Sequence, residues 1–421
     1  MIRNSIRNKA WLTILLAVAV MHADAQSILL SNATIIDGEA KRTPRKASVL
    51  IDNGLIKTIS SRKINTPAHT QVIDCSGKFI VPGLMDAHVH LATLDLSDQQ
   101  KARQQTDSIL YNMIRHGITT VRDMAGDARF LQSLSRAAEK DNPWSPSIFY
   151  AAQFAGPEYF RMMGNGRKGQ DPGGNQPWAR SITDTSNIAA AVADAKAWGA
   201  TGIKIYAELS GALVAAITKE ARKQGVLAWS HAAVNPALPA DMANAGVNSM
   251  SHANDLVFQQ FPSGTPIGKV WEAIYKGLKA DSAVLFPVLQ TMKKKKIYFD
   301  PTLFHAANNN MINAAVIARW AHQLGIAFVA GTDWIYPLKN QAVPLLDELR
   351  HLGKDAGLGN AEIIQAATMN AARVTGLQDR GLVRKGMRAD LLILDSDPLK
   401  DISVLFSPQI VIRKGSILSF K

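Results

Sequence analysis

The chain has 421 residues, of which 47% are hydrophobic and 19% are charged, so it is long enough to bury the core of one large barrel domain and an accessory domain. The formal net charge of +13 can indicate acidic partners, but no compact basic and aromatic motif accompanies it, so we expect no nucleic-acid partner. The sharpest basic run, Lys293 to Lys296, is interpreted as a solvated helix end.

Residues 1–25 have the pattern of a secretory signal peptide. Basic residues at positions 3, 7 and 9 precede an apolar run from Trp11 to Val20, and Ala23-Asp24-Ala25 resembles a cleavage site. The apolar run is too short to span a bilayer, so we expect no membrane span once the signal is removed. We therefore expect an exported protein, either periplasmic or secreted. Cys75 is the only cysteine, which excludes an intramolecular disulfide.

Both ends of the mature chain predict short strands. Residues 26–80 alternate apolar runs with turns, and Asn53-Gly54 between two such runs predicts a two-residue hairpin. Strand-like runs return after residue 380, around Asp397-Pro398 and Lys414-Gly415. We expect residues 26–80 and 381–421 to pair in one small β-sandwich, into which residues 81–380 are inserted.

Residues 81–380 alternate β-prone runs with helical patterns, which is typical of parallel strands joined by crossover helices. Helices are expected at Ile188 to Trp198 and at Leu213 to Gln224, each followed by a glycine. Eight parallel strands favour a closed (β/α)8 TIM-like barrel, an α/β fold, over an open sheet. The expected strands are Leu84 to His90, Ile118 to Met124, Ser147 to Phe154, Gly202 to Ala207, Val226 to His231, Val247 to His252, Ile297 to Leu303 and Ile326 to Asp333.

Chemistry-bearing residues stand at the carboxyl ends of these strands, where the active sites of such barrels lie. His88 and His90 end the first strand on one side of it, and two imidazoles at this spacing can hold a metal ion through neutral ring nitrogens. Strand five ends in His231, strand six in His252 and strand eight in Asp333. Each residue alone has a plainer interpretation as a hydrogen-bonded rim residue or, for Asp333, as a turn or helix cap. Together they predict a metal site.

The fourth expected strand carries a lysine that must point into the barrel. Ile203 and Ile205 face one way, so Lys204 and Tyr206 face the other. A buried ammonium either meets an acid or loses its proton, and a neutral amine can add carbon dioxide to become N6-carboxylysine. The two oxygens of that carbamate can bridge two metal ions. Tyr206 at the rim and His305, just past strand seven, are candidates for substrate contact.

These motifs resemble the amidohydrolase superfamily of metal-dependent hydrolases, in particular its secreted imidazolonepropionase-like and prolidase-like (Xaa-dipeptidase) branch. The resemblance covers nearly the whole mature chain, through VPGLMDAHVH, GIKIYA, WSHA, SMSHA, GTDW, ATMNAARVTGL and GMRADLLILDSDPLKDI. It implies a binuclear centre of two divalent metal ions, for which the nitrogen-rich ligand set favours zinc. The implied ligands are His88, His90 and Asp333 for the first ion, His231 and His252 for the second, and Lys204 as the bridging carbamate.

The chain departs from the family pattern at two places that bear on the substrate. It has His231-Ala232-Ala233-Val234 where many dipeptidase-like relatives have His-Ala-His-Gly, and Ser251-His252-Ala253 where the branch more often has Glu-His-Gly. These departures leave dipeptide specificity open, although they leave every implied metal ligand in place.

We therefore expect a metal-dependent hydrolase acting on carbon-nitrogen bonds, which cleaves an amide in a small-molecule substrate such as a dipeptide or an N-acyl amino acid. Asp333 is expected to shuttle the proton. A lactonase or phosphotriesterase on the same site is the alternative. A catalytically inactive periplasmic binding protein is disfavoured, because a degenerate binder is expected to lose ligands and none is missing. The oligomeric state stays open, a homo-oligomer included.

The longest loop on the expected active face runs from Gly156 to Thr183. It has glycines at positions 164, 166, 169, 173 and 174, and its basic residues are Arg161, Arg167, Lys168 and Arg180. Loops of this length without regular structure are usually functional or disordered. We expect a lid in which Arg161 or Arg180 pairs with a substrate carboxylate, and a plain surface insertion is the alternative.

Overall fold

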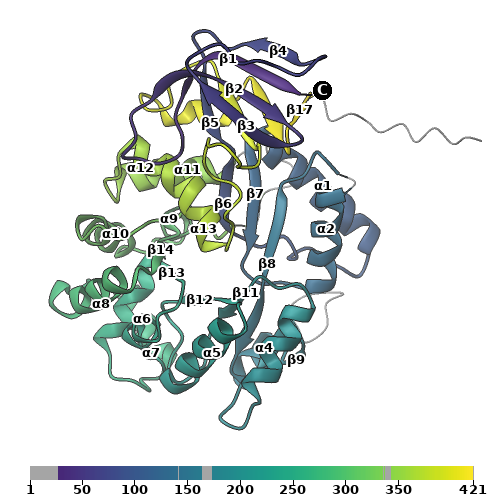
Figure 1. Ribbon diagram of the computed structural model, residues 1–421. Coiled ribbons are helices and arrows are strands. Elements are labelled where there is room, and N and C mark those ends of the chain that lie inside the picture. The colour runs from purple at the N-terminus through teal and green to yellow at the C-terminus, as the bar shows by residue number, and fades with distance from the viewer. Residues whose placement is uncertain (1–26, 141, 164–172, 335, 337–342, 421) are drawn as a thin grey trace, which may run out of the picture.

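The computed structural model describes residues 27–140, 142–163, 173–334, 336 and 343–420. The expected signal peptide lies outside these residues, as do Arg167, Lys168 and the glycines at 164, 166 and 169 of the expected lid. Figure 1 shows a sheet that both ends of the chain form, next to a larger ring of strands and helices. Within the described ranges, no helix is both long enough and apolar enough to cross a membrane.

Seven strands of the middle segment pair side by side in parallel. In chain order they are β6 (Leu84–Val89), β7 (Ile118–Asp123), β8 (Ser147–Ala155), β11 (Gly202–Ile205), β12 (Leu227–His231), β13 (Ser249–Ser251) and β14 (Tyr298–Asp300). Each overlaps an expected strand. All but β8 are shorter than expected, which leaves several polar residues just beyond a strand end, where the site is built.

The eighth expected strand closes the ring without forming a regular strand of its own. Phe328 makes an isolated parallel bridge to Phe299 of β14, and Trp334 makes one to Val89 of β6. Between them, the backbone N–H of Ala87 donates to the carbonyl of Ala330 at 2.8 Å. This segment therefore joins the last strand to the first, and the predicted (β/α)8 barrel is confirmed in a nearly closed form.

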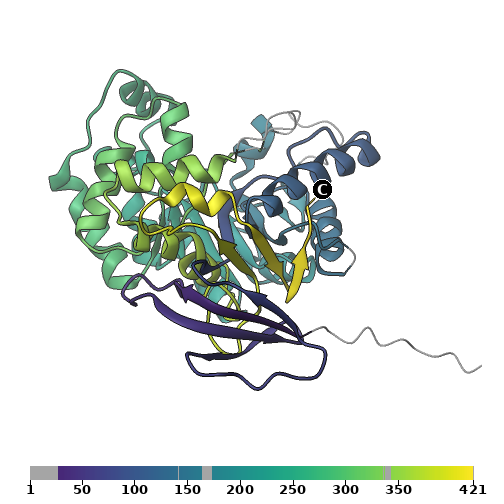
Figure 2. The same ribbon diagram turned by 90° about the horizontal axis from the view of Figure 1, so that it is seen from above.

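Helices cover the outside of the barrel (Figure 2). The expected helices are confirmed as α4 (Ile188–Ala197) and α5 (Gly211–Lys223). The exposed Lys293 to Lys296 run forms the end of α8, as expected. The remaining helices are α1 (Gln99–Arg115), α2 (Ala128–Lys140), α3 (Pro157–Met163), α6 (Pro239–Ala245), α7 (Ile267–Tyr275), α8 (Ser282–Lys295), α9 (Leu303–Asn308), α10 (Ala314–Gln323), α11 (Pro344–Lys354), α12 (Asn360–Gln365) and α13 (Ala371–Val374), with short 3-10 or π turns at η1 (Ala253–Gln260), η2 (Ala366–Asn370) and η3 (Ile402–Phe406).

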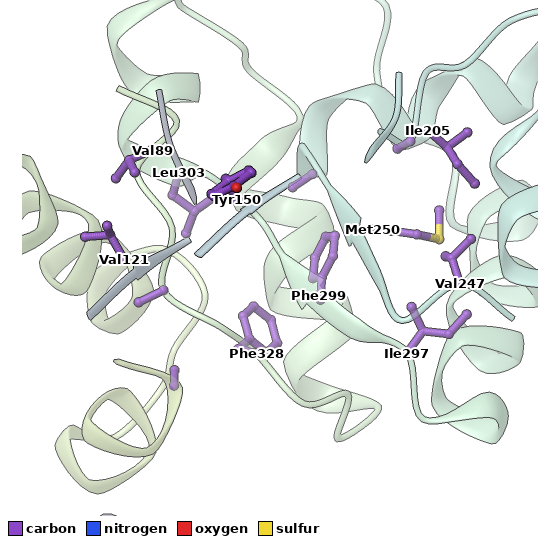
Figure 3. Close-up of a cluster of buried hydrophobic side chains, with 14 of the residues drawn as sticks. Val89, Val121, Tyr150, Ile205, Val247, Met250, Ile297, Phe299, Leu303 and Phe328 are labelled. Carbon is purple, nitrogen blue, oxygen red and sulfur yellow. The ribbon is translucent and has the colours of Figure 1, made fainter. Parts of the chain in front are cut away.

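The main core lies between the strands and these helices. Ile205, Met250 and Phe299 are fully buried there, on alternate positions of their strands. Figure 3 shows Phe299 beside Phe328, whose ring centroid lies 5.5 Å away in an edge-on arrangement. This apolar layer fixes which side chains of each strand face outward, and it leaves the alternate residues to face the barrel interior.

The loop expected to act as a lid contains regular structure. Its described residues form α3 and two short strands, β9 (Asn175–Gln176) and β10 (Ala179–Ser181), and β10 pairs in parallel with β8. The expectation of a segment without regular structure is therefore wrong for the residues that the structure describes. The proline at position 157 starts α3, and pairing with β8 holds the returning end of the loop against the barrel.

The two ends of the chain form one mixed sheet in the order β17-β16-β15-β5-β1-β2-β3, with β4 also paired to β1. The predicted small β domain built from both ends is confirmed, and hydrogen bonds join its strands into one sheet instead of the two of a sandwich. The turn of the expected hairpin has φ of 51° at Asn53 and 76° at Gly54. The strands are β1 (Ile28–Ile35), β2 (Arg45–Asp52), β3 (Leu55–Ser60), β4 (Gln71–Asp74), β5 (Phe79–Pro82), β15 (Leu391–Leu394), β16 (Ile410–Arg413) and β17 (Ser416–Leu418).

Candidate metal centre

The first group of expected ligands comes together at the carboxyl ends of the barrel strands. His88 lies near the end of β6, His90 follows that strand, and Asp333 lies in the eighth segment, just before Trp334. The Oδ1 atom of Asp333 is 3.2 Å from Nε2 of His88 and 3.0 Å from Nε2 of His90. Ligand atoms of His88, His252 and Asp333 all lie within 4.8 Å of one another, which is close enough for one metal ion to reach all three.

His231 and His252 continue the cluster from the ends of β12 and β13. Their ring centroids lie 4.6 Å apart, and the ring of His252 is 5.3 Å from that of His88. The rings of His88 and His90 are 5.5 Å apart. The structure therefore brings the four histidines and Asp333 into one continuous cluster.

His252 reaches this cluster through an unusual backbone conformation. Ser249 and Ser251 of β13 face the barrel interior, where their hydroxyls form hydrogen bonds with buried charged side chains. Strict alternation would therefore turn His252 outward. Its φ of 71° lies in the left-handed region and turns the ring back inward, and Asp333 has a φ of 49°. Side chains in this region are strained, and such residues concentrate at functional sites.

Lys204 is fully buried within the barrel, as alternation in β11 predicted. Its Nζ atom donates a hydrogen bond to Oγ of Ser251 at 3.2 Å. Burial lowers the pKa of Lys204 from 10.5 to about 7, although the carboxylates of Asp300 and Asp333 oppose the shift. A substantial part of this lysine is therefore a neutral amine near pH 7, which is the form that can add carbon dioxide.

Three histidines of the cluster have one ring nitrogen held by the protein. The Nδ1 partners are Oδ2 of Asp300 for His88 at 2.8 Å, the carbonyl of Ala125 for His90 at 3.1 Å, and Oγ1 of Thr302 for His252 at 3.0 Å. Metal-binding histidines are typically held in this way by one nitrogen while the other faces the ion. Nε2 of His88 is buried without a hydrogen-bond partner among the described residues, since Asp333 faces it without hydrogen-bond geometry. This orphaned nitrogen fits a metal ligand.

The electrostatics of the cluster also suit metal binding. Burial lowers the pKa of His231 and of His252 well below the usual value, so both imidazoles are neutral. Burial opposes ionisation of Asp333, but the neighbouring histidines, His88 first, outweigh it and hold the pKa of Asp333 well below its usual value. His88 lies between Asp333 and Asp300, whose carboxylates outweigh burial and raise its pKa. The neutral imidazoles of His231 and His252 beside the ionised Asp333 are an appropriate donor set for a divalent cation.

The family model described as the amidohydrolase family matches residues 79–418. The chain belongs to the amidohydrolase family. The superfamily resemblance drawn from the strand-end motifs is thus confirmed. Amidohydrolases typically bind metal ions, in agreement with the cluster of His88, His252 and Asp333.

Two curated relatives of this amidohydrolase match over short segments. An enamidase of Eubacterium barkeri is 29% identical over 108 residues, which are 25% of this chain and 27% of the relative. A dihydroorotase of Trichlorobacter lovleyi is 38% identical over 65 residues, 15% of each chain. The matched segments thus span about a quarter or less of these relatives.

Solved structures match over nearly the whole chain. A Xaa-Pro dipeptidase with bound methionine has a TM-score of 0.74 and 21% identity, covering 94% of this chain and 100% of that one. A putative prolidase from Bifidobacterium longum has a TM-score of 0.69 and 22% identity, covering 94% and 95%. The ochratoxinase of A. niger has a TM-score of 0.70 and 20% identity, covering 93% and 95%. The fold of this amidohydrolase is therefore shared with prolidase-like structures.

Asp300, which was not among the predicted site residues, ends β14 and contacts the cluster directly. Its Oδ2 atom accepts hydrogen bonds from Nδ1 of His88 at 2.8 Å, from Oγ of Ser251 at 3.0 Å and from Nη2 of Arg122 at 3.2 Å. A Cβ atom on Gly331 would lie 2.5 Å from Oδ1 of Asp300, so glycine is needed for the eighth segment to pass this close. The sequence signal was available, because Asp300 follows an apolar run at a strand end as the other candidates do.

Two further buried carboxylates flank the cluster without having been predicted. Asp86 accepts hydrogen bonds from the hydroxyls of Thr332 at 2.9 Å and Tyr336 at 2.8 Å, which ties β6 to the residue preceding Asp333. Burial raises the pKa of Asp86 to about 6 and that of Asp255 to about 7. Asp255 lies in a short 3-10 turn, and its sequence context gave no signal of proximity to the site.

Both rim candidates for substrate contact adjoin the cluster. The ring of Tyr206 is 4.1 Å from that of His231 and 5.0 Å from that of Tyr159. The Nδ1 atom of His305, in α9, is 3.4 Å from Oδ2 of Asp333. These positions suit groups that contact a substrate held over the metal ligands.

The two arginines expected to pair with a substrate carboxylate are each held by an acidic neighbour. Arg161 is 74% exposed and forms an ion pair with Glu158 of the same helix. Arg180 pairs with Asp194 of α4 at 2.8 Å. Their described ion pairs therefore direct them to acidic side chains outside the histidine cluster.

Proposed function

We propose that this amidohydrolase is an exported enzyme that uses two divalent metal ions to hydrolyse an amide bond, in a dipeptide or an N-acyl amino acid. The observation that carries the proposal is the pair His88 and His90, whose Nδ1 atoms are held by the protein while an ionised Asp333 faces their Nε2 atoms. In this proposal the ligands are His88, His90 and Asp333 for the first ion, His231 and His252 for the second, and Lys204 as a bridging carbamate. The nitrogen-rich set favours zinc.

The residues around the ions provide proton transfer and orientation. When bound, the ions supply an activated water molecule and polarise the carbonyl of the scissile bond. Asp333 accepts a proton from the water and delivers it to the nitrogen of the leaving amine. Its Oδ2 atom lies 3.7 Å from Nδ1 of His252 and 3.4 Å from Nδ1 of His305, so the carboxylate borders both the ligands and the rim. One amide and one water thus give one acid and one amine.

The substrate class rests on the named activities of structural neighbours and on the rim of the site. Solved neighbours named as a Xaa-Pro dipeptidase and a prolidase motivate an amide of an amino acid as the substrate. Tyr206 and His305 are positioned to contact its oxygen atoms. Export is proposed from the signal-like pattern of residues 1–25, and fractionation of cells that make the full chain tests it.

A hydrolysis screen of the metal-loaded protein tests the proposed reaction. Panels of dipeptides, N-acyl amino acids, lactones and phosphotriesters are incubated with the wild-type protein and with the Asp333→Asn variant. We expect turnover in one of the two amide panels, and its loss in the variant. Turnover confined to lactones or phosphotriesters would contradict the proposed substrate class, and absence of turnover on all four panels would contradict the proposed reaction.

A further inference from the structure

A chain of buried hydrogen bonds joins the two halves of the proposed metal centre through Asp300. The carboxylate accepts from Nδ1 of His88 at 2.8 Å and from Oγ of Ser251 at 3.0 Å. The same hydroxyl of Ser251 accepts from Nζ of Lys204 at 3.2 Å. All four side chains are fully buried. A ligand of the first ion and the bridging lysine therefore share one carboxylate.

The neighbouring groups fix which atom donates and which accepts in each of these linked hydrogen bonds. Arg122 is fully buried, donates from Nη2 to Oδ2 of Asp300 at 3.2 Å, and has its guanidinium carbon 4.8 Å from the ring centre of Trp229. A guanidinium cannot accept, so Asp300 acts as the acceptor. The Ser251 hydroxyl must then donate to Asp300 and accept from Lys204. A carbamate formed on Lys204 would retain one N–H, which can still donate to the hydroxyl of Ser251.

We propose that Asp300 is a positioning residue that couples the two metal sites, because it orients His88 directly and Lys204 through Ser251. This inference rests on the proposed function, since coupling requires that two ions bind. The first ion keeps three other protein ligands when the lysine is misplaced, whereas the second keeps only His231 and His252. Loss of the Ser251 hydroxyl therefore weakens mainly the second binding step, and loss of the Asp300 carboxylate weakens both.

Stepwise zinc affinities of the full chain test this coupling without reference to activity. Metal-free wild type, Asp300→Asn, Ser251→Ala and Ser230→Ala are each titrated with Zn²⁺ against a competing chelator, at fixed pH and bicarbonate. Ser230 is a matched control because it also precedes a histidine of the cluster and is fully buried, while its hydroxyl has no partner among the described residues. Far-ultraviolet circular dichroism and thermal unfolding confirm that each variant is folded.

We expect Asp300→Asn to weaken both binding steps by about 10- to 100-fold, and Ser251→Ala to weaken the second step by a similar factor. The zinc affinity of the first binding step in Ser251→Ala should differ from that of wild type by no more than the affinity of Ser230→Ala does. Ser251→Thr keeps the hydroxyl and should recover the second step. If Asp300→Asn does not fold, the coupling is tested by comparing the second binding step of Ser251→Ala with that of Ser251→Thr.

The outcomes separate this inference from the proposed function. If Ser251→Ala binds both ions as Ser230→Ala does, or if Asp300→Asn weakens one step only, the coupling is refuted while the two-metal centre stands. If the wild-type chain binds no divalent ion, the proposed function and the coupling are both overturned.

Discussion

Replacement of Lys204 by methionine is expected to stabilise the metal-free protein, although it removes a residue that the proposed metal centre needs. The pKa of this lysine falls from 10.5 to about 7 on burial, and one pKa unit corresponds to about 1.4 kcal/mol, so the buried ammonium costs about 5 kcal/mol when fully protonated. The unfolded chain keeps the proton up to pH 10.5, whereas the folded chain loses it above about pH 7. Between these values the unfolded state binds more protons, so stability rises with pH.

The size of the effect therefore depends on pH in a defined direction. Lys204→Met should raise the free energy of unfolding by about 4 kcal/mol at pH 7 and by only about 2 kcal/mol at pH 9, because the cost fades as the pH approaches 10.5. Urea unfolding of the chelator-treated wild type and variant at both pH values measures this change in the free energy of unfolding. Lys219→Met, in an exposed position of α5, is the control and should change stability by less than about 0.5 kcal/mol. A destabilised Lys204→Met protein, or a gain as large at pH 9 as at pH 7, would refute the reasoning.

Two further substitutions probe the site and its support. Asp333→Asn should keep the fold and at least one metal ion while lowering turnover by roughly a hundredfold or more, because an amide can ligate weakly but cannot carry the proton. Steady-state kinetics together with a metal assay checks this expectation. Near-wild-type turnover would assign the proton transfer to another residue. Arg122→Met should lower the free energy of unfolding by about 3–5 kcal/mol, because it leaves the fully buried Asp300 without the guanidinium that pairs with it. Urea unfolding measures this loss, and an unfolding transition with unchanged midpoint and slope would contradict the prediction.

The strand-end positions of the site were predictable because they follow from local periodicity. Alternation in β6 placed His88 and His90 on one side, and alternation in β11 turned Lys204 inward. Glycines at 199 and 225, both with positive φ, marked the ends of α4 and α5. Each of these signals is contained within a few consecutive residues, so the sequence alone is sufficient to read it.

The remaining features depend on packing between distant segments. Asp300 accepts hydrogen bonds from three other strands, β6, β7 and β13, and no local pattern specifies which of them meet. The inward turn of His252 depends on a left-handed φ that alternation does not predict. In the terminal sheet, β5 lies between β1 and β15, so its register joins residues from opposite ends of the chain.

The metal content of the purified protein tests the binuclear centre most directly. Protein that contains residues 26–421, purified without chelator and with bicarbonate present, is analysed for divalent metals by elemental analysis against its measured concentration. We predict close to two ions per chain, with a loss of both after substitution of His88 and His252 together, because the proposal assigns these two residues to different ions. One ion per chain, or none, would contradict the binuclear centre.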